Sequence, residues 1–336
     1  MIDRTPARPP FTVVRSDLAR AATPSDHALD GAVVAIGNFE GVHRGHRAVI
    51  AVALARGREL TRKTAVLTFE PHPRAVFRPD EPVFRLSDEA AKLRLLARTG
   101  LDGVIVMRFD AALAALSADD FVQKILIERF AVAGVVVGFD FHFGKGRAGS
   151  PAFLEAAGKA HGFMVDIVPA FSDDGVRISS GAVRKALAAG EVEAAAAMLG
   201  YPWFVSGAVV HGDKRGRELG FPTANLRLDP ACGLEHGVYA VRVGIGGRHL
   251  DGVANFGRRP MFDTGVVLLE VFLFDFKEDI YGETIDVAFI HRIRPELTFP
   301  SVDALVRRMG DDCNLARAAL ARAPHAFPPI GPPGSL

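Results

Sequence analysis

The sequence has little cysteine, little net charge and no long apolar run. Only two of its 336 residues are cysteines, Cys232 and Cys313, and they are too far apart in sequence to form a CxxC pair of metal ligands. This argues against a disulfide framework and against a zinc cluster. The formal net charge is +1. A protein that coats nucleic acid carries a clear basic excess, so we expect no nucleic-acid partner.

No apolar run is long enough to span a bilayer, and residues 1–10 lack the apolar segment of a signal peptide. The sequence therefore predicts a cytoplasmic protein with no membrane partner. Hydrophobic residues make up 49% of the chain, which is enough to bury sizeable cores. A chain of this length usually contains two domains.

In the first half of the chain, short apolar runs alternate with amphipathic stretches. The expected strands are 32–36, 64–69, 104–108, 135–139 and 165–168, and the expected helices are 46–60, 88–99, 118–130, 151–161, 180–189 and 191–199. The strand runs are apolar throughout, as strands buried on both faces should be. This predicts an α/β domain with a parallel sheet covered by helices on both faces.

After residue 202 the pattern changes to short strands separated by tight turns. Strands are expected at 203–211, 238–243, 250–255, 266–274 and 284–291, with a hairpin loop at 244–247 and a closing helix at 301–322. These elements predict a small antiparallel barrel or sandwich with a terminal helix. We expect an N-terminal extension (1–29), a first domain (30–190), a helical linker (191–202), a second domain (203–323) and a proline-rich disordered tail (324–336).

The first motif reads GNFEGVHRGH at residues 37–46 and follows an expected strand. His43 and His46 are three residues apart at the start of a helix, which places both imidazoles on one face of its first turn. The free amides of the helix N-terminus and the small Gly45 allow an anion to approach. Such donors suit a phosphoryl group that gains negative charge during reaction. The alternatives are that the histidines only cap the helix or bind a metal, although no third ligand lies nearby in sequence.

The second motif reads GDKRGRELGFPTAN at residues 212–225. Its glycines let backbone amides surround phosphate oxygens, and Thr223 and Asn225 offer hard oxygen ligands for Mg²⁺. Glu270 lies in an apolar, strand-like run, and a buried carboxylate requires a partner or a function. The alternatives are an ordinary glycine-rich hairpin with solvated charges and an outward-facing Glu270.

A third stretch, GKGRAG at residues 144–149, matches the pattern GxGxxG. It does not follow its strand directly, and no acidic partner for a ribose is evident, so a mobile loop beside the substrate is favoured over a dinucleotide site. Ser150 follows Gly149 where a P-loop would require lysine.

The first motif resembles the HxGH signature of nucleotidyltransferases, specifically the adenylyltransferase module of prokaryotic bifunctional riboflavin kinase/FAD synthetases. Later segments fit the same module in order, reading FEPHP, GFDFHFG and ISSGAVR at residues 69–73, 138–144 and 178–184. The resemblance implies a Rossmann-like nucleotidyltransferase domain that adenylylates FMN to FAD and releases pyrophosphate.

The second motif is similar to the phosphate-binding and PTAN region of the riboflavin kinase module. Segments GVYA, ANFGRRP and LEVFLFDF, at residues 237–240, 254–260 and 269–276, continue the likeness in order. The resemblance implies ATP-dependent phosphorylation of riboflavin to FMN. It implies Mg²⁺ as cofactor, ATP as co-substrate, and riboflavin, FMN and FAD as substrates and products, and it leaves a homo-oligomer open.

The resemblance also assigns roles to individual residues. His43 and His46 would stabilise the transition state at the ATP α-phosphate, and Glu270 would accept the proton of the riboflavin 5′-hydroxyl. The residues implied to bind ATP or its phosphates are Gly37, Asn38, Phe39, Gly45, Arg177, Ser179, Ser180, Arg184, Gly212, Lys214, Gly216, Arg217 and Gly220. Those implied to contact flavin or other ligands are Asp140, Phe141, Asn255 and Arg259, and those implied to bind Mg²⁺ are Thr223 and Asn225.

Four residues depart from the family pattern. Glu40 stands where the family usually has Asp, Gly181 and Met261 where it has Thr, and Phe272 where it has His. Glu40 and Gly181 keep one alternative open, a riboflavin kinase whose first domain only binds flavin or nucleotide. The other alternative is a nucleotidyltransferase for a different acceptor, with the barrel as a nucleic-acid-binding appendage.

Overall fold

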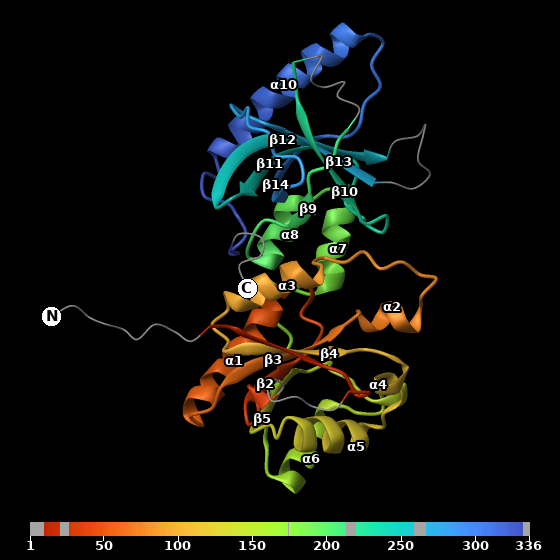
Figure 1. The fold of residues 1–336 in the computed structure, drawn as a ribbon, viewed down its shortest axis with the longest axis vertical. Helices are drawn as coiled ribbons and strands as arrows, with labels where there is room; N and C mark the ends of the chain where they lie inside the picture. The colour runs from red at the N-terminus through yellow and green to blue at the C-terminus, as the bar shows by residue number, and fades with distance from the viewer. Residues whose placement is uncertain (1–9, 21–26, 174, 213–219, 259–266, 332–336) are drawn as a thin grey trace, which may run out of the picture. The chain divides into compact units, whose positions relative to one another are not determined.

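The computed structural model describes residues 10–20, 27–173, 175–212, 220–258 and 267–331. These residues form two compact units, drawn in Figure 1. The first unit contains residues up to 83 and residues 92–178, and the second contains residues 84–91 and those from 179 onward. Among the described helices, none combines the length and apolar character needed to cross a membrane.

The first unit is built on a six-stranded, all-parallel sheet, which confirms the predicted class. In sheet order the strands are β1 (Thr12–Ser16), β4 (Gly103–Arg108), β3 (Thr64–Glu70), β2 (Val33–Ile36), β5 (Gly134–Gly138) and β6 (Met164–Val168). β2 is buried at every position, as the continuously apolar pattern predicted.

Strand β1 was not predicted, because residues 12–16 were assigned to an N-terminal extension. It pairs in parallel with β4, from Thr12 opposite Gly103 to Ser16 opposite Met107. As an edge strand it is only partly buried, so it lacks the continuous apolar run by which its neighbours were found.

Helices and short turns complete the first unit (Figure 1). They are η2 (Glu40–Val42), α1 (Arg44–Glu59), α2 (Pro73–Phe77), α3 (Glu89–Ala97, from Lys92 onward), α4 (Ala111–Ala115), α5 (Ala118–Asp120), the π-helical segment η3 (Phe121–Arg129), η4 (Lys145–Arg147), α6 (Pro151–His161) and the two-stranded hairpin β7 (Ser172–Asp173) and β8 (Val176–Arg177). Helix α1 packs against β2, β3, β5 and β6.

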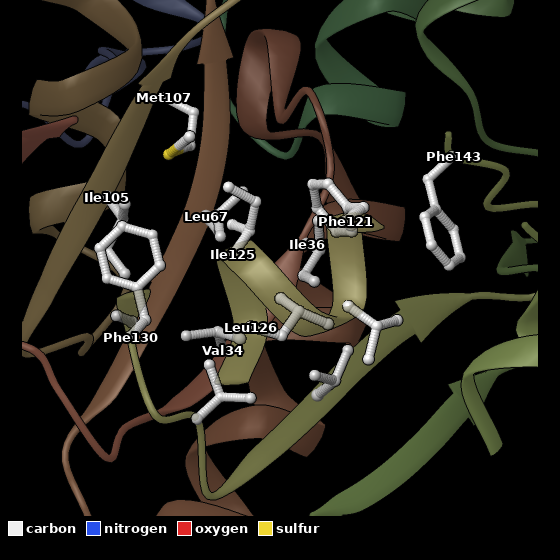
Figure 2. Packing of buried hydrophobic residues seen from close by; sticks show 14 of the residues in the cluster. Val34, Ile36, Leu67, Ile105, Met107, Phe121, Ile125, Leu126, Phe130 and Phe143 are labelled. Carbon is white, nitrogen blue, oxygen red and sulfur yellow. The ribbon is translucent and has the colours of Figure 1, made fainter. Parts of the chain in front are cut away.

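The core of this unit joins the sheet to segment η3. Figure 2 shows Val34, Ile36 and Leu67 from the strands close to Ile125 and Leu126 from η3. These side chains are at most 2% exposed. Because the central strands are filled with apolar side chains, polar groups gather where the strands end.

The strand order places a topological switch point beside β2. The chain runs from β2 outward through β3 and β4, and then returns to the other side of β2 to form β5 and β6. In such sheets, ligands bind in the crevice at the carboxyl ends of the strands where the order reverses. The motif at 37–46 follows β2 and the segment at 138–144 follows β5, so both lie at this point.

The second unit is built on a six-stranded antiparallel sheet that curls into a nearly closed barrel, as predicted. In sheet order the strands are β10 (Thr223–Leu228), β13 (Val267–Leu273), β12 (Arg248–Arg258), β11 (Gly237–Ile245), β14 (Thr284–Arg294) and β9 (Phe204–Ala208). Just beyond β9, the Val210 amide donates to the Asn225 carbonyl at 2.8 Å, which brings the two edge strands together. Strand β10 was not predicted, because residues 212–225 were assigned to a glycine-rich loop.

Three helices belong to the barrel unit: α7 (Ser180–Ala188), α8 (Val192–Leu199) and α10 (Val302–Ala321). Helix α7, expected at the end of the first domain, is part of this second unit. Helix α8, expected as a linker, packs against α7 and strand β14. The predicted hairpin loop is a two-residue turn, in which Gly246 and Gly247 both have positive φ, at 52° and 80°.

Helix α10 covers the outer face of β11 and β12, and one buried arginine ties its end to the barrel. Arg242 is 5% exposed. Its guanidinium donates to Asp251 Oδ1 at 2.8 Å and to the Leu320, Ala323 and Ala326 carbonyls. It therefore supplies a charged donor to carbonyl groups at and just beyond the C-terminus of helix α10.

Residues 324–331, part of the segment that was expected to be disordered, contact the barrel strands. The Phe327 ring stacks on His249 with centroids 3.9 Å apart. It fills the space over Gly244, where an added Cβ would lie 2.6 Å from the ring, and Pro328 is buried. Phe327 thus packs into the space that Gly244 leaves open because it has no side chain.

Replacing Arg242 with methionine should lower the stability of the barrel unit by about 2–4 kcal/mol, because buried carbonyl groups lose a charged donor. The measurement is urea unfolding followed through Trp203, the single tryptophan, which lies in this unit. Arg248→Met is the matched control. Its guanidinium pairs with Glu278 on the surface, so little change is expected. Equal effects of the two substitutions would contradict the role given to Arg242.

Candidate active sites

The turn after β2 holds several residues in unusual backbone conformations. Phe39 and Val42 have φ values of 47° and 37°, and Gly41 has 67°. Left-handed conformations of bulky residues cost energy and often occur at functional sites. Helix α1 starts directly after this turn, and its N-cap is His43, whose Nδ1 accepts a hydrogen bond from the His46 amide at 3.2 Å. His43 therefore does cap the helix, and in its neutral form it carries its proton on Nε2.

The two histidine rings stack in parallel. Their centroids are 3.6 Å apart with an interplanar angle of 15°, and the Phe39 ring lies 5.1 Å from that of His46. Nδ1 of His46 is buried and has no hydrogen-bond partner among the described residues. An unpaired polar atom inside a protein is rare and indicates a ligand or a function.

Burial lowers the pKa of His46 well below 6.5, and the positive charges of His43 and Lys92 lower it further. His46 is therefore neutral near pH 7. A neutral imidazole can still donate one hydrogen bond to a phosphate oxygen. The His46 ring is thus better suited to donate a hydrogen bond than to carry a permanent positive charge.

A polar cluster that sequence reasoning missed lies beneath this turn. Lys92 is 2% exposed, and its Nζ lies 2.7 Å from Oε1 of Glu70 and 3.2 Å from Oγ1 of Thr68. The Thr68 hydroxyl in turn donates to the Asn38 carbonyl at 3.1 Å. In the sequence, Lys92 reads as a polar position of an amphipathic helix, so only the packing identifies it.

Glu40, the longer carboxylate that replaces the family's Asp, is also buried. It is 2% exposed, and its Oε2 lies 3.7 Å from Nε2 of His72 in the EPHP segment. Nδ1 of His72 accepts a hydrogen bond from the Arg74 amide, which leaves Nε2 as the proton-bearing atom that faces Glu40. The first unit thus accommodates the substitution with a partner for its charge.

The segment after β5 contributes a second charged pair. Asp140 accepts a hydrogen bond from the Arg177 guanidinium at 2.6 Å, and that guanidinium lies 4.8 Å from the centroid of the Phe139 ring. Both side chains are more than half exposed, at 60% and 53%. Phe141, expected to contact flavin, packs against the core and stacks on Phe143 at 5.6 Å.

The ISSGAVR segment continues in the second unit, where it forms the start of helix α7. Ser179 caps the helix, and its Oγ accepts a hydrogen bond from the Ala182 amide at 3.2 Å. Arg184 Nε donates to the Phe84 carbonyl at 2.6 Å. A Cβ at Gly181 would meet only Ser179 Oγ, at 3.8 Å, so the missing threonine leaves open space. Ser180 is half-buried in the first turn.

In the barrel, three predicted site residues line up across adjacent strands. Glu270 on β13 lies opposite Asn225 on β10 and opposite Asn255 on β12. Directly opposed residues in antiparallel strands point to the same face of the sheet. Thr223 lies two residues before Asn225 and therefore shares that face. The register thus gathers two amides, a carboxylate and a hydroxyl on one outer face.

Asn225 has the features expected of a ligand-binding residue. It is 4% exposed, and its Oδ1 is buried without a hydrogen-bond partner in the described chain. Gly212 packs directly against this amide, because a Cβ at Gly212 would lie only 2.5 Å from Nδ2 of Asn225. The arrangement therefore leaves a hard oxygen atom available and fits a small hard cation such as Mg²⁺.

Several predicted residues cannot be placed in this geometry. Lys214, Gly216, Arg217 and Arg259 lie outside the described residues, as does Met261. Gly220 is described and has a φ of 85°. Phe272, where the family has His, lies opposite Thr223 in the barrel register.

The depressed pKa of His46 gives a testable pH dependence. We expect its imidazole to remain neutral as the pH falls through 6.5 and to take up a proton only at clearly lower pH. The unfolded chain takes up that proton near 6.5, so this residue makes the fold less stable as the pH falls below that value. NMR titration of the imidazole signals, assigned with His46→Gln, checks this. A midpoint at or above 6.5 would contradict the buried, neutral ring.

Two family models match this chain, one in each half of the sequence. The model described as FAD synthetase matches residues 25–182, and the model described as riboflavin kinase matches residues 199–320. Together they cover most of the sequence.

Similarity to individual proteins extends over nearly the whole chain. The bifunctional riboflavin kinase/FMN adenylyltransferase of Escherichia coli K12 is 44% identical over 86% of this chain and 92% of its own length. The protein of the same description from Haemophilus influenzae is 41% identical over 90% of this chain and 98% of its own. A solved structure titled as a macrolide-efflux protein from Streptococcus pneumoniae has a TM-score of 0.80 and 32% identity, and the match covers 91% of this chain and 99% of that one. The chain belongs to the family of bifunctional riboflavin kinase/FMN adenylyltransferases.

Proposed function

We propose that the two units of this chain catalyse successive reactions on one small molecule. The second unit phosphorylates riboflavin with ATP to give FMN, and the first unit adenylylates FMN with ATP to give FAD and pyrophosphate. One observation carries the proposal: each of the two family matches coincides with a folded unit that has its own polar site. The reaction sequence therefore runs from the second unit to the first.

In the kinase step, Glu270 is the proposed general base. Its carboxylate accepts the proton of the riboflavin 5′-hydroxyl while that oxygen attacks the γ-phosphorus of ATP and the bond to ADP breaks. The flanking amides of Asn225 and Asn255 orient the reacting groups. Thr223 and Asn225 Oδ1 would hold Mg²⁺, which, when bound, neutralises charge on the phosphates.

In the adenylylation step, the attacking group is already an anion. A phosphate oxygen of FMN attacks the α-phosphorus of ATP, and the bond to the β-phosphate breaks to release pyrophosphate. No alcohol must lose a proton, so stabilisation of developing charge dominates. The His46 ring, the Nε2–H group of His43 and the N-terminal amides of α1 supply hydrogen-bond donors at this place. Arg177, with Asp140, would bind phosphate or ligand beside them.

Glu40 and Gly181 depart from the family pattern in the FAD-forming module. The packing around both residues supports the view that this chain still forms FAD. Glu40 is buried with His72 as a partner, and Gly181 leaves only open space. A kinase with a merely binding first domain is therefore the weaker alternative. We also propose that the reactions take place in the cytoplasm without a nucleic-acid partner, in keeping with the formal charge of +1.

Substitutions in the two units should separate the two activities. His46→Ala should lower FAD formation from supplied FMN by about 10²- to 10³-fold, because a donor to the developing charge is lost. Glu270→Gln should lower FMN formation from riboflavin by about 10²- to 10⁴-fold, because the base is lost. Each variant should leave the other step unchanged when both products are followed by chromatography. An effect on the opposite step would refute the assignments.

The contact between Gly212 and Asn225 predicts a sensitive position in the kinase site. Gly212→Ala places a Cβ that must displace the Asn225 amide, so FMN formation should fall by about 10-fold or more and require more Mg²⁺. FAD formation from supplied FMN should not change. Gly310→Ala, in helix α10 with open space around it, is the matched control and should behave as the unchanged protein. Normal FMN formation by Gly212→Ala would argue against the proposed cation site.

A further inference from the structure

The proposed adenylylation site rests on a buried lysine that contacts three polar groups. Lys92 Nζ lies 2.7 Å from Glu70 Oε1, 3.2 Å from Thr68 Oγ1 and 3.5 Å from the Asn38 carbonyl. The lysine side chain is 2% exposed and the Glu70 side chain 10%. A buried ion pair costs much of what it gains, and an apolar pair of similar volume often stabilises a fold as well or better. Stability alone is therefore a poor explanation for this charge.

The contacts of Lys92 control the orientation of one peptide group. The Asn38 carbonyl accepts hydrogen bonds from the Thr68 hydroxyl and from Lys92. In a planar trans peptide, the carbonyl and the following N–H point in opposite directions. The Phe39 amide is therefore directed away from Lys92 and Thr68. Within the part of the chain that the structure describes, neither the Asn38 nor the Phe39 amide donates to another residue.

The same lysine acts electrostatically on the histidine pair. Its positive charge is one of the causes that lower the pKa of His46, after burial and the charge of His43. Lys92 thus lies close enough to His46 to influence its protonation.

We propose that Lys92 is a positioning residue for adenylyl transfer. With Thr68 and Glu70 it fixes the Asn38 carbonyl, so that the amides of the turn and the neutral His46 ring face the α-phosphate of ATP. Lys92 itself does not touch the substrate. This inference rests on the proposed FAD-forming function of the first unit.

The test uses the full chain and three variants. Lys92→Met combined with Glu70→Gln removes both charges of the ion pair, so that no buried carboxylate is left unpaired. Thr68→Val removes only the hydroxyl that bonds to Asn38, and Lys63→Met, on the surface, is the control for loss of a lysine. For each we would measure kcat and KM of FAD formation from FMN and ATP, the rate of FMN formation from riboflavin, and the NMR titration of His46.

The double variant should lose about 100-fold in kcat for FAD formation, because a small misplacement of the donors has an effect of this size. Its KM for FMN and its rate of FMN formation should stay nearly unchanged, and the pKa of His46 should rise because a nearby positive charge is gone. Thr68→Val should lose about 10-fold in kcat and keep the low pKa of His46. Lys63→Met should match the unchanged protein.

The proposal is overturned if the double variant keeps its kcat. It is equally overturned if FAD formation falls only through KM, or if both activities fall together, because the residue would then serve stability alone. If the unchanged protein forms FMN but no FAD, the proposed function fails instead. In that case the His46 titration still decides whether Lys92 controls the turn, since an unchanged pKa in the double variant would refute the arrangement.

Discussion

The two sites differ because their sheets bury side chains differently. In the first unit the central strands are covered on both faces, so a polar side chain can lie only at a strand end or beside a partner inside. The histidine pair lies at a strand end, whereas Lys92 lies inside the unit and is paired with Glu70. In the barrel, helix α10 covers only part of the outer face. Asn225 and Glu270 can therefore lie along the strands themselves.

In the first unit, apolar pattern and motif were enough to predict most of the fold and the histidine pair. The central strands are continuously apolar because both faces are buried, and the glycines and histidines after β2 mark the turn into a helix. The edge strand β1 escaped notice because one side of it faces solvent. Lys92 escaped for a different reason. A lysine in an amphipathic helix normally lies on the solvent side. Nothing in the local sequence shows that the buried Glu70 forms an ion pair with Lys92.

In the second unit, a family resemblance was enough to name the residues of the site. It did not predict how these residues are arranged in space. The row of Asn225, Glu270 and Asn255 depends on the register of three strands that are distant in sequence. Strand β10 itself was hidden, because the glycine-rich segment before it suggests a loop. Composition also cannot reveal that Phe327 packs over Gly244. Pairing and shape complementarity, unlike periodicity, are properties of the folded chain.

The central feature of this protein is that one chain performs two transfers from different phosphorus atoms of ATP. The most direct measurement follows labelled phosphate from ATP into flavin products, with purified protein, riboflavin and Mg²⁺. Label in the γ-phosphate should enter FMN first and then FAD, because the first transfer moves that group. Label in the α-phosphate should appear in FAD and pyrophosphate should be released, with no α-label in FMN. FMN formation without any α-labelled FAD would contradict the account.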